Sequence, residues 1–185
     1  LGIKKLINKY DLEVFNIEKL NTHGGSIRYF IKRKSNLKIK INKNVKKQFK
    51  SELNFKMDKL STYIKFKNKV EKSKKKLKNI FQKIKKQNKK IIGYGSTAKS
   101  VTVLNYCNID KNIIDYFVDT TPDKTNKYMP GTHIYIKKYN KKFLKNVDYI
   151  FLGAWNFKNE IFKKEKNYLK KGGKFISHVP KQRII

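Results

Sequence analysis

The spacing of apolar residues in the first 31 positions indicates a short helix followed by two strands. Leu6, Ile7 and Tyr10 lie at helical spacing, whereas apolar residues alternate with polar ones in 12–17 and again in 26–31. The flexible pair Gly24-Gly25 lies between the two alternating segments and is typical of a turn. Two strands alone cannot bury a core. They therefore need a further sheet, or they pack on the residues that follow.

The pattern becomes helical from about residue 54 to residue 88. Its apolar residues recur at three- and four-residue steps, and lysines fill most other positions: Met57, Leu60, Ile64, Val70, Leu77, Ile80, Phe81 and Ile84. The lysine-rich stretch within it is interpreted as a solvated helix face rather than an arm that binds nucleic acid. We predict one long connecting helix in this part of the chain.

Short apolar segments alternate with helical patterns from residue 90 onward. Strands are predicted at 91–93, 114–118, 133–136, 149–152 and 174–179, and helices at 97–107 and 157–169. This alternation predicts an α/β fold, with a Rossmann-like parallel sheet and flanking helices.

Composition bounds the function without identifying it. The net charge of +34 is compatible with nucleic-acid binding, but the chain has 44 Lys and only 3 Arg, with 19 Asn and 22 Ile. Lys, Asn and Ile have A/T-rich codons, so base bias explains the charge, and a nucleic-acid partner is not expected. Nucleic-acid sites also favour Arg, because its planar fork makes paired contacts.

The single cysteine, Cys107, excludes a disulfide or a thiolate zinc site formed within this chain. No apolar run approaches the length needed to span a membrane, about 20 residues. The opening residues do not read as a signal peptide, so none is expected. We expect no membrane association and a reducing, cytoplasmic location.

The sequence GYGSTAKS, residues 93–100, joins the first predicted strand of the alternating region to a helix. Gly93 and Gly95 suit a tight turn that approaches a ligand closely, with Tyr94 between them. Ser96 or Thr97 can cap the helix, whose free N–H groups attract anions, and Lys99 can reach a phosphate. The third glycine of a nicotinamide-binding turn is absent, and so is the spacing of a Walker loop.

Polar residues also follow two other predicted strands. Asp119 comes after the second strand, where an acidic residue meets a ribose hydroxyl in dinucleotide folds, although it could equally cap a turn. Trp155 and Asn156 follow the strand at 149–152, at the edge where open α/β sheets bind ligands. Trp155 suits stacking on a base or sugar, or a place in the core. Asn156 suits a hydrogen bond to a ligand.

These residues alone leave two functions open. The turn at Gly93 and Gly95, together with Asp119, fits a nucleotide-binding (NAD-type) oxidoreductase or a nucleotide sensor as well as other phosphate ligands.

Four motifs in order carry a resemblance over nearly the whole chain, from Asp11 to Pro180. They are NTHGGSIRYFI (21–31), IIGYGSTAKSVTVLNYCNI (91–109), YFVDTTPDKTNKYMPGTHIYI (116–136) and FLGAWNFKNEI (151–161). Together they resemble the C-terminal half of three-domain S-adenosylmethionine-dependent C-methyltransferases that act on deoxysugar nucleotides.

The resemblance implies a division of the chain into three parts. Residues 1–45 correspond to the end of the S-adenosylmethionine-binding domain, 46–88 to a connecting helix and 89–185 to a Rossmann-like substrate domain. The family's N-terminal zinc module and its Tyr-x-Glu-His catalytic motif have no counterpart here. Because residues 1–10 already suit the inside of a helix, we expect a fragment. We expect it to be inactive by itself, because the catalytic motif and most of the S-adenosylmethionine-binding motifs are missing. The missing N-terminal half is then a possible partner.

The resemblance also implies which ligand the chain holds. The substrate domain of the family faces a nucleotide-diphosphate sugar, so the turn at 93–99 is interpreted as a cradle for the diphosphate. His23 becomes a candidate catalytic residue, although an exposed loop histidine is the alternative. Arg28 and His133 become candidate substrate contacts, with a surface ion pair as the alternative for Arg28. His178 is interpreted as structural.

Overall fold

The computed structural model describes the backbone of residues 1–185 and every side chain apart from that of His23. The chain divides into two compact units, Leu1–Lys69 and Val70–Ile185, and the boundary falls inside the long helix α3 (Leu60–Lys86).

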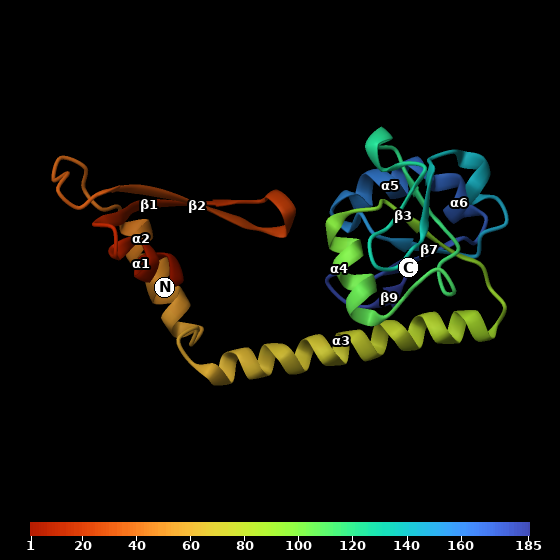
Figure 1. Cartoon of the computed structure of the whole chain (residues 1–185), viewed down its shortest axis with the longest axis horizontal. Coiled ribbons are helices and arrows are strands. Elements are labelled where there is room, and N and C mark those ends of the chain that lie inside the picture. Colours follow the sequence, from red (N-terminus) through yellow and green to blue (C-terminus); the bar gives the residue numbers. More distant parts are fainter. The chain divides into compact units, whose positions relative to one another are not determined.

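The first unit is built on an antiparallel pair of strands, β1 (Leu12–Leu20) and β2 (Ser26–Arg33), joined by a short 3₁₀ turn (Thr22–Gly24) (Figure 1). The helices α1 (Gly2–Asn8) and α2 (Lys43–Asn54) pack against this pair. A small core holds the elements together: Ile7, Val14, Ile17 and Val45. The described residues of this unit give the pair no third strand.

The second unit contains a mostly parallel sheet with the strand order β5-β6-β4-β3-β7-β8-β9 in the described backbone. Its parallel strands are β3 (Ile91–Tyr94), β4 (Phe117–Asp119), β6 (Tyr135–Lys138), β7 (Tyr149–Leu152) and β8 (Lys174–Ser177). The short strands β5 (Lys127–Tyr128) and β9 (Arg183–Ile184) pair antiparallel at its two edges. The predicted Rossmann-like α/β fold is confirmed.

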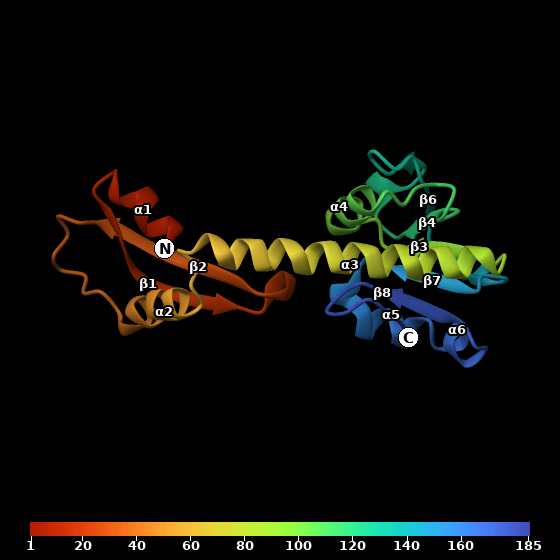
Figure 2. The same cartoon turned by 90° about the horizontal axis from the view of Figure 1, so that it is seen from below.

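Helices cover both faces of this sheet, so its central strands are apolar on both sides (Figure 2). On one face, α3 and α4 (Ala98–Cys107) pack on alternate strand residues that include Ile91, Phe117 and Phe151. On the other, α5 (Lys158–Lys164) and α6 (Lys166–Lys170) pack on Ile92, Val118, Ile150 and Phe175. Two adjoining residues of one strand thus contribute to two different cores.

The helices differ from the predicted ones at two places. The segment 54–88 contains α3 only from Leu60 onward, because a turn at 55–59 separates it from α2. The helix predicted at 157–169 is divided at Glu165 into α5 and α6.

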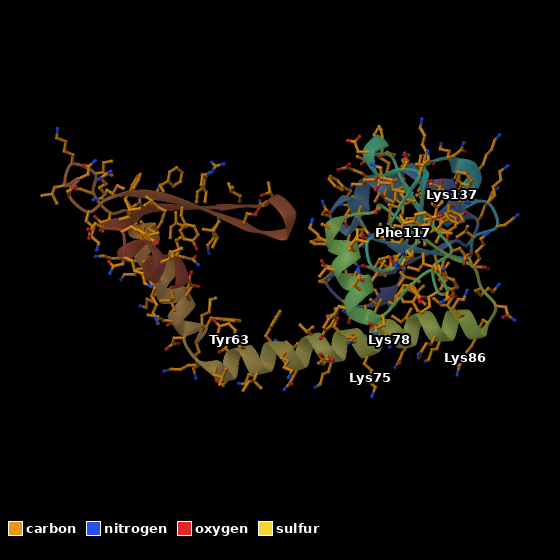
Figure 3. The ribbon with its side chains drawn as sticks, in the orientation of Figure 1. Tyr63, Lys75, Lys78, Lys86, Phe117 and Lys137 are labelled. Atoms are coloured by element: carbon orange, nitrogen blue, oxygen red, sulfur yellow. The ribbon has the colours of Figure 1, made fainter. Side chains whose placement is uncertain are left out.

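In the second unit, the exposed Lys75 and Lys86 extend from the side of α3 that faces away from the sheet, whereas Phe117 lies inside (Figure 3). The lysines of this stretch therefore form a solvated face.

Candidate functional site

The strand order brings the ends of β3 and β7 together. The chain continues from β3 to β4 and β6 on one side, then crosses over and adds β7 and β8 on the other side of β3. Because β3 and β7 are parallel and paired, the loops that follow them emerge side by side at the carboxyl edge of the sheet. This reversal point is where open α/β sheets bind their ligands.

The turn after β3 is held against the turn after β7. Gly95 has φ +81°, and a Cβ built on it would lie 2.5 Å from the Cβ of Ala154. The Thr97 hydroxyl donates to the Gly153 carbonyl oxygen at 3.2 Å. Glycine is therefore required at position 95 both by its backbone angle and by the close approach of the second turn.

Thr97 caps the helix that starts at this turn. Its hydroxyl accepts from the N–H of Ser100 at 3.1 Å, and its own N–H donates to the Ser100 hydroxyl at 2.9 Å, which makes a capping box. The N–H groups of Ala98 and Lys99 have no acceptor among the described residues. These two donors, at the positive end of α4, are available to an anion.

Asp119, at the end of β4, ties two loops together. One of its carboxylate oxygens accepts from the Ser96 N–H at 2.7 Å and the other from the Thr121 N–H at 2.8 Å. The side chain is buried, and Lys124 Nζ lies 3.9 Å from the same oxygen that accepts from Ser96. This arrangement fixes the backbone of the glycine turn relative to the neighbouring strand.

Lys99 and Trp155 meet across the two loops. The Lys99 Nζ lies 5.4 Å from the centre of the Trp155 ring, within range of a cation–π interaction. Both side chains are half-buried, and Trp155 begins a 3₁₀ turn (Trp155–Phe157) directly after the Gly153–Ala154 turn. Asn156 is exposed beside it. The structure thus brings together three of the residues selected from the sequence.

Gly93 and Tyr94 contribute to the core below the turn. A Cβ on Gly93 would lie 2.3 Å from the Phe117 ring. Tyr94 is buried in the core on the face covered by α5 and α6, and its hydroxyl donates to Glu165 at 3.0 Å. Burial, followed by the Glu165 charge, raises the pKa of Tyr94 well above its ordinary value, so this hydroxyl stays protonated.

His133 is not part of this cluster, and the two remaining candidates belong to the first unit. His133 is exposed, with φ +54°, and precedes β6, so it lies at the amino edge of the sheet. Arg28 belongs to the first unit, where it forms an exposed ion pair with Glu18 across the strands at 3.1 Å. The side chain of His23 lies outside the described residues, and its catalytic role stays a prediction.

His178 lies after β8 and is buried with its ring stacked on Phe151, 5.2 Å between centres. Its Nδ1 has no hydrogen-bond partner among the described residues. Burial lowers the pKa of His178 from 6.5 to about 4, because the charged ring would lose its water.

We therefore expect the second unit to lose stability as the pH falls from 6.5 to 4. The unfolded chain takes up a proton on His178 in this window and the folded chain does not, so the loss amounts to about 3 kcal/mol. Urea unfolding at several pH values measures it, with His178→Phe as the control that keeps the stacking. If the free energy of unfolding changed with pH in the same way in both proteins, the assignment of this effect to His178 would be wrong.

Among the described side chains, no three His, Cys, Asp or Glu residues gather into a group that could hold a metal ion. None of the described helices is both long and apolar enough to cross a membrane.

The sequence analysis missed residues that shape the site without offering reactive groups. Gly153 and Ala154 contact the glycine turn, and a Cβ on Gly153 would lie 2.3 Å from the Gly95 carbonyl oxygen. The pair of small residues directly after an apolar strand was the available signal, since it indicates a close backbone approach there.

Comparison with known proteins identifies the family of this chain. The family model described as C-methyltransferase C-terminal domain matches residues 21–180. The C-methyltransferase NovU of Streptomyces niveus is 36% identical over 97 residues, which is 52% of this chain and 23% of that protein. The match thus spans less than a quarter of the relative's length. Because the family model covers most of this chain, the chain belongs to the family of C-methyltransferase C-terminal domains.

Proposed function

We propose that the second unit binds the diphosphate of a keto-deoxysugar nucleotide, and that it serves an S-adenosylmethionine-dependent C-methyltransferase as its substrate-side domain. The observation that supports this most directly is the meeting of Lys99 and Trp155 at the reversal point of the sheet. The Lys99 ammonium, the Trp155 ring and the N-terminus of α4 thereby lie around one position.

Each part of this arrangement has a role in the proposed binding. The N–H groups of Ala98 and Lys99 donate to one phosphate, and the Lys99 ammonium supplies a point charge. The Trp155 ring offers a flat apolar surface for the base or the sugar, and the exposed Asn156 amide offers a hydrogen bond. Asp119 accepts from the Ser96 and Thr121 N–H groups, so its role in the proposed binding is to fix the backbone of the turn.

The surroundings of Asp119 also bear on whether the glycine turn can bind S-adenosylmethionine. S-adenosylmethionine supplies the methyl group in this class of reaction, but Asp119 is only 7% exposed and both its oxygens lie against backbone N–H groups, so it offers no accessible surface to a ribose. The glycine turn therefore does not fit this cofactor, and we assign no step at this site to it. For the same reason, Asp119 does not provide the ribose contact that the NAD-type oxidoreductase alternative requires.

Calorimetric titration of the chain with thymidine diphosphate tests the proposal. We expect saturable binding of thymidine diphosphate, and no energy transfer from Trp155 to NADH in a fluorescence titration. Tight binding of S-adenosylmethionine without binding of thymidine diphosphate would contradict the proposed division of roles. Saturable NADH binding would favour the oxidoreductase alternative.

Lys99→Ala is expected to weaken thymidine diphosphate binding about ten- to a hundredfold. The substitution removes one charge-assisted contact, which contributes roughly 1.5–3 kcal/mol, and leaves the backbone donors in place. Lys86→Ala, on the exposed side of α3, is the matched control and should change the affinity little. Thermal unfolding checks folding. Equal losses from the two variants would show that the affinity arises from bulk charge alone.

A further inference from the structure

A cleft lies on the face of the sheet that α5 and α6 cover. It has a volume of about 560 Å³, and its apolar wall is formed by Leu144, Val147 and Tyr168. Protein clefts of roughly 300–1,000 Å³ hold small molecules. The residues that line it are distinct from the glycine turn, Lys99 and Trp155.

The cleft contains a buried carboxylate that lacks a cationic partner. Glu165 is only 3% exposed, and its Oε1 accepts from the hydroxyls of Tyr94 at 3.0 Å and Tyr139 at 2.7 Å. No donor among the described residues reaches Oε2, and none of their ammonium or guanidinium groups forms a salt bridge with this carboxylate. In a chain with 47 Lys and Arg residues, an unpaired buried carboxylate is unexpected, because burying such a charge is costly.

The local backbone gives this carboxylate its position. Glu165 is the residue between α5 and α6, with φ −101° and ψ +26°, and its carbonyl oxygen accepts from the Leu169 N–H. The helix is interrupted at the residue that enters the cleft. The two tyrosines that donate to Oε1 contact each other, 5.6 Å between ring centres, so this oxygen is held firmly. The second oxygen is left for another donor.

Lysines surround the same cleft. Lys141, Lys145, Lys164 and Lys171 all line it and are all exposed. The Lys164 Nζ lies 3.5 Å from the centre of the Tyr139 ring, next to the hydroxyl that donates to Glu165. Four positive charges around one negative charge attract an anion and repel an amine. The donor that suits Glu165 is therefore a neutral hydroxyl.

We propose that this cleft binds a small phosphorylated polyol or sugar. A ligand hydroxyl donates to Glu165 Oε2, the phosphate lies among the rim lysines, and the carbon face packs on Tyr168 and Leu144. Lysine is a suitable point charge for phosphate, and a hydrogen bond to a carboxylate is one of the stronger polar contacts. This binding is separate from the diphosphate site proposed at the carboxyl edge.

Calorimetry with ribose 5-phosphate and with inorganic phosphate tests the proposal. Glu165→Gln should weaken ribose 5-phosphate binding about tenfold or more and leave inorganic phosphate binding unchanged, because only the hydroxyl contact depends on the carboxylate. Glu160→Gln, an exposed glutamate of α5, is the matched control and should change neither. Lys164→Ala should weaken both ligands about tenfold, whereas its exposed neighbour Lys163→Ala should change neither.

Three results would overturn the proposal. One is the absence of saturable ribose 5-phosphate binding at millimolar concentrations, and another is unchanged binding in Glu165→Gln. The third is an equal loss from Lys163→Ala and Lys164→Ala, which would indicate general attraction of anions. If Glu165→Gln fails to unfold cooperatively, NMR of the wild-type chain decides, through the changes in amide chemical shift that ribose 5-phosphate causes. Changes at Glu165–Tyr168 support binding in the cleft. Changes at Ser96–Lys99 alone overturn it. Lys99→Ala should leave ribose 5-phosphate binding intact, which separates this result from the diphosphate site.

Discussion

Gly95→Val should reduce thymidine diphosphate binding more than a hundredfold and destabilise the second unit by about 2–5 kcal/mol. A φ of +81° costs a residue with a side chain roughly 1–2 kcal/mol, and more when it is β-branched. The new Cβ would also lie 2.5 Å from the Cβ of Ala154, and overpacking of this kind costs roughly 1–3 kcal/mol. The turn must then move away from the end of β7, which separates the two loops that form the proposed site.

Gly172→Val provides the matched control. Gly172 has φ +83°, but nothing lies within 4 Å of a Cβ built there, so the substitution should cost only the backbone contribution of roughly 1–2 kcal/mol. Urea unfolding and calorimetry of both variants separate the two effects. Equal destabilisation would show that packing against Ala154 has no energetic role. A folded Gly95→Val protein that binds thymidine diphosphate normally would exclude the turn as the site.

The strands of the second unit were predictable because their signal is local. The apolar run 149–152 corresponds to β7 without any shift, since a strand buried on both faces is apolar at every position. The edge strands β5 and β9 were not identified, because they are short and exposed and contain Lys127 and Arg183. The predicted strand at 133–136 is displaced from β6 because His133 adopts a left-handed conformation that interrupts extended backbone.

The candidate site was predictable only in part. Each loop could be assigned to a strand end, but the contact between Lys99 and Trp155 depends on β7 pairing with β3, which lies 58 residues away along the chain. The Thr121 N–H bond to Asp119 is the local turn contact that the sequence offered as one reading, but the bond from the distant Ser96 N–H carries no sequence signal. Glu165 was overlooked because an acidic residue in a lysine-rich helix suggests an exposed position, whereas here its carboxylate is held by two distant tyrosines.

The apolar residues of α3 form one helical stripe in the sequence, but they differ in their surroundings. Leu77, Phe81 and Ile84 are buried in the core of the second unit, and Phe81 packs on Phe151 with 5.7 Å between ring centres. Leu60 and Phe66, earlier in the same helix, are 74% and 66% exposed. The helix therefore contributes to the stability of the second unit only through its later turns.

Phe81→Ala is accordingly expected to destabilise the second unit by about 3–5 kcal/mol, as is usual for removing a fully buried aromatic ring. The lost ring contacts Phe151, a residue of the central strand β7, and the cavity would lie between helix and sheet. Phe66→Ala makes the same chemical change at an exposed position of the same helix, so its effect should stay within about 0.5 kcal/mol. Urea unfolding followed by Trp155 fluorescence reports on the second unit alone. A comparable loss in both variants would mean that the stripe is covered along its whole length, and an unchanged Phe81→Ala protein would mean that α3 is not part of this core.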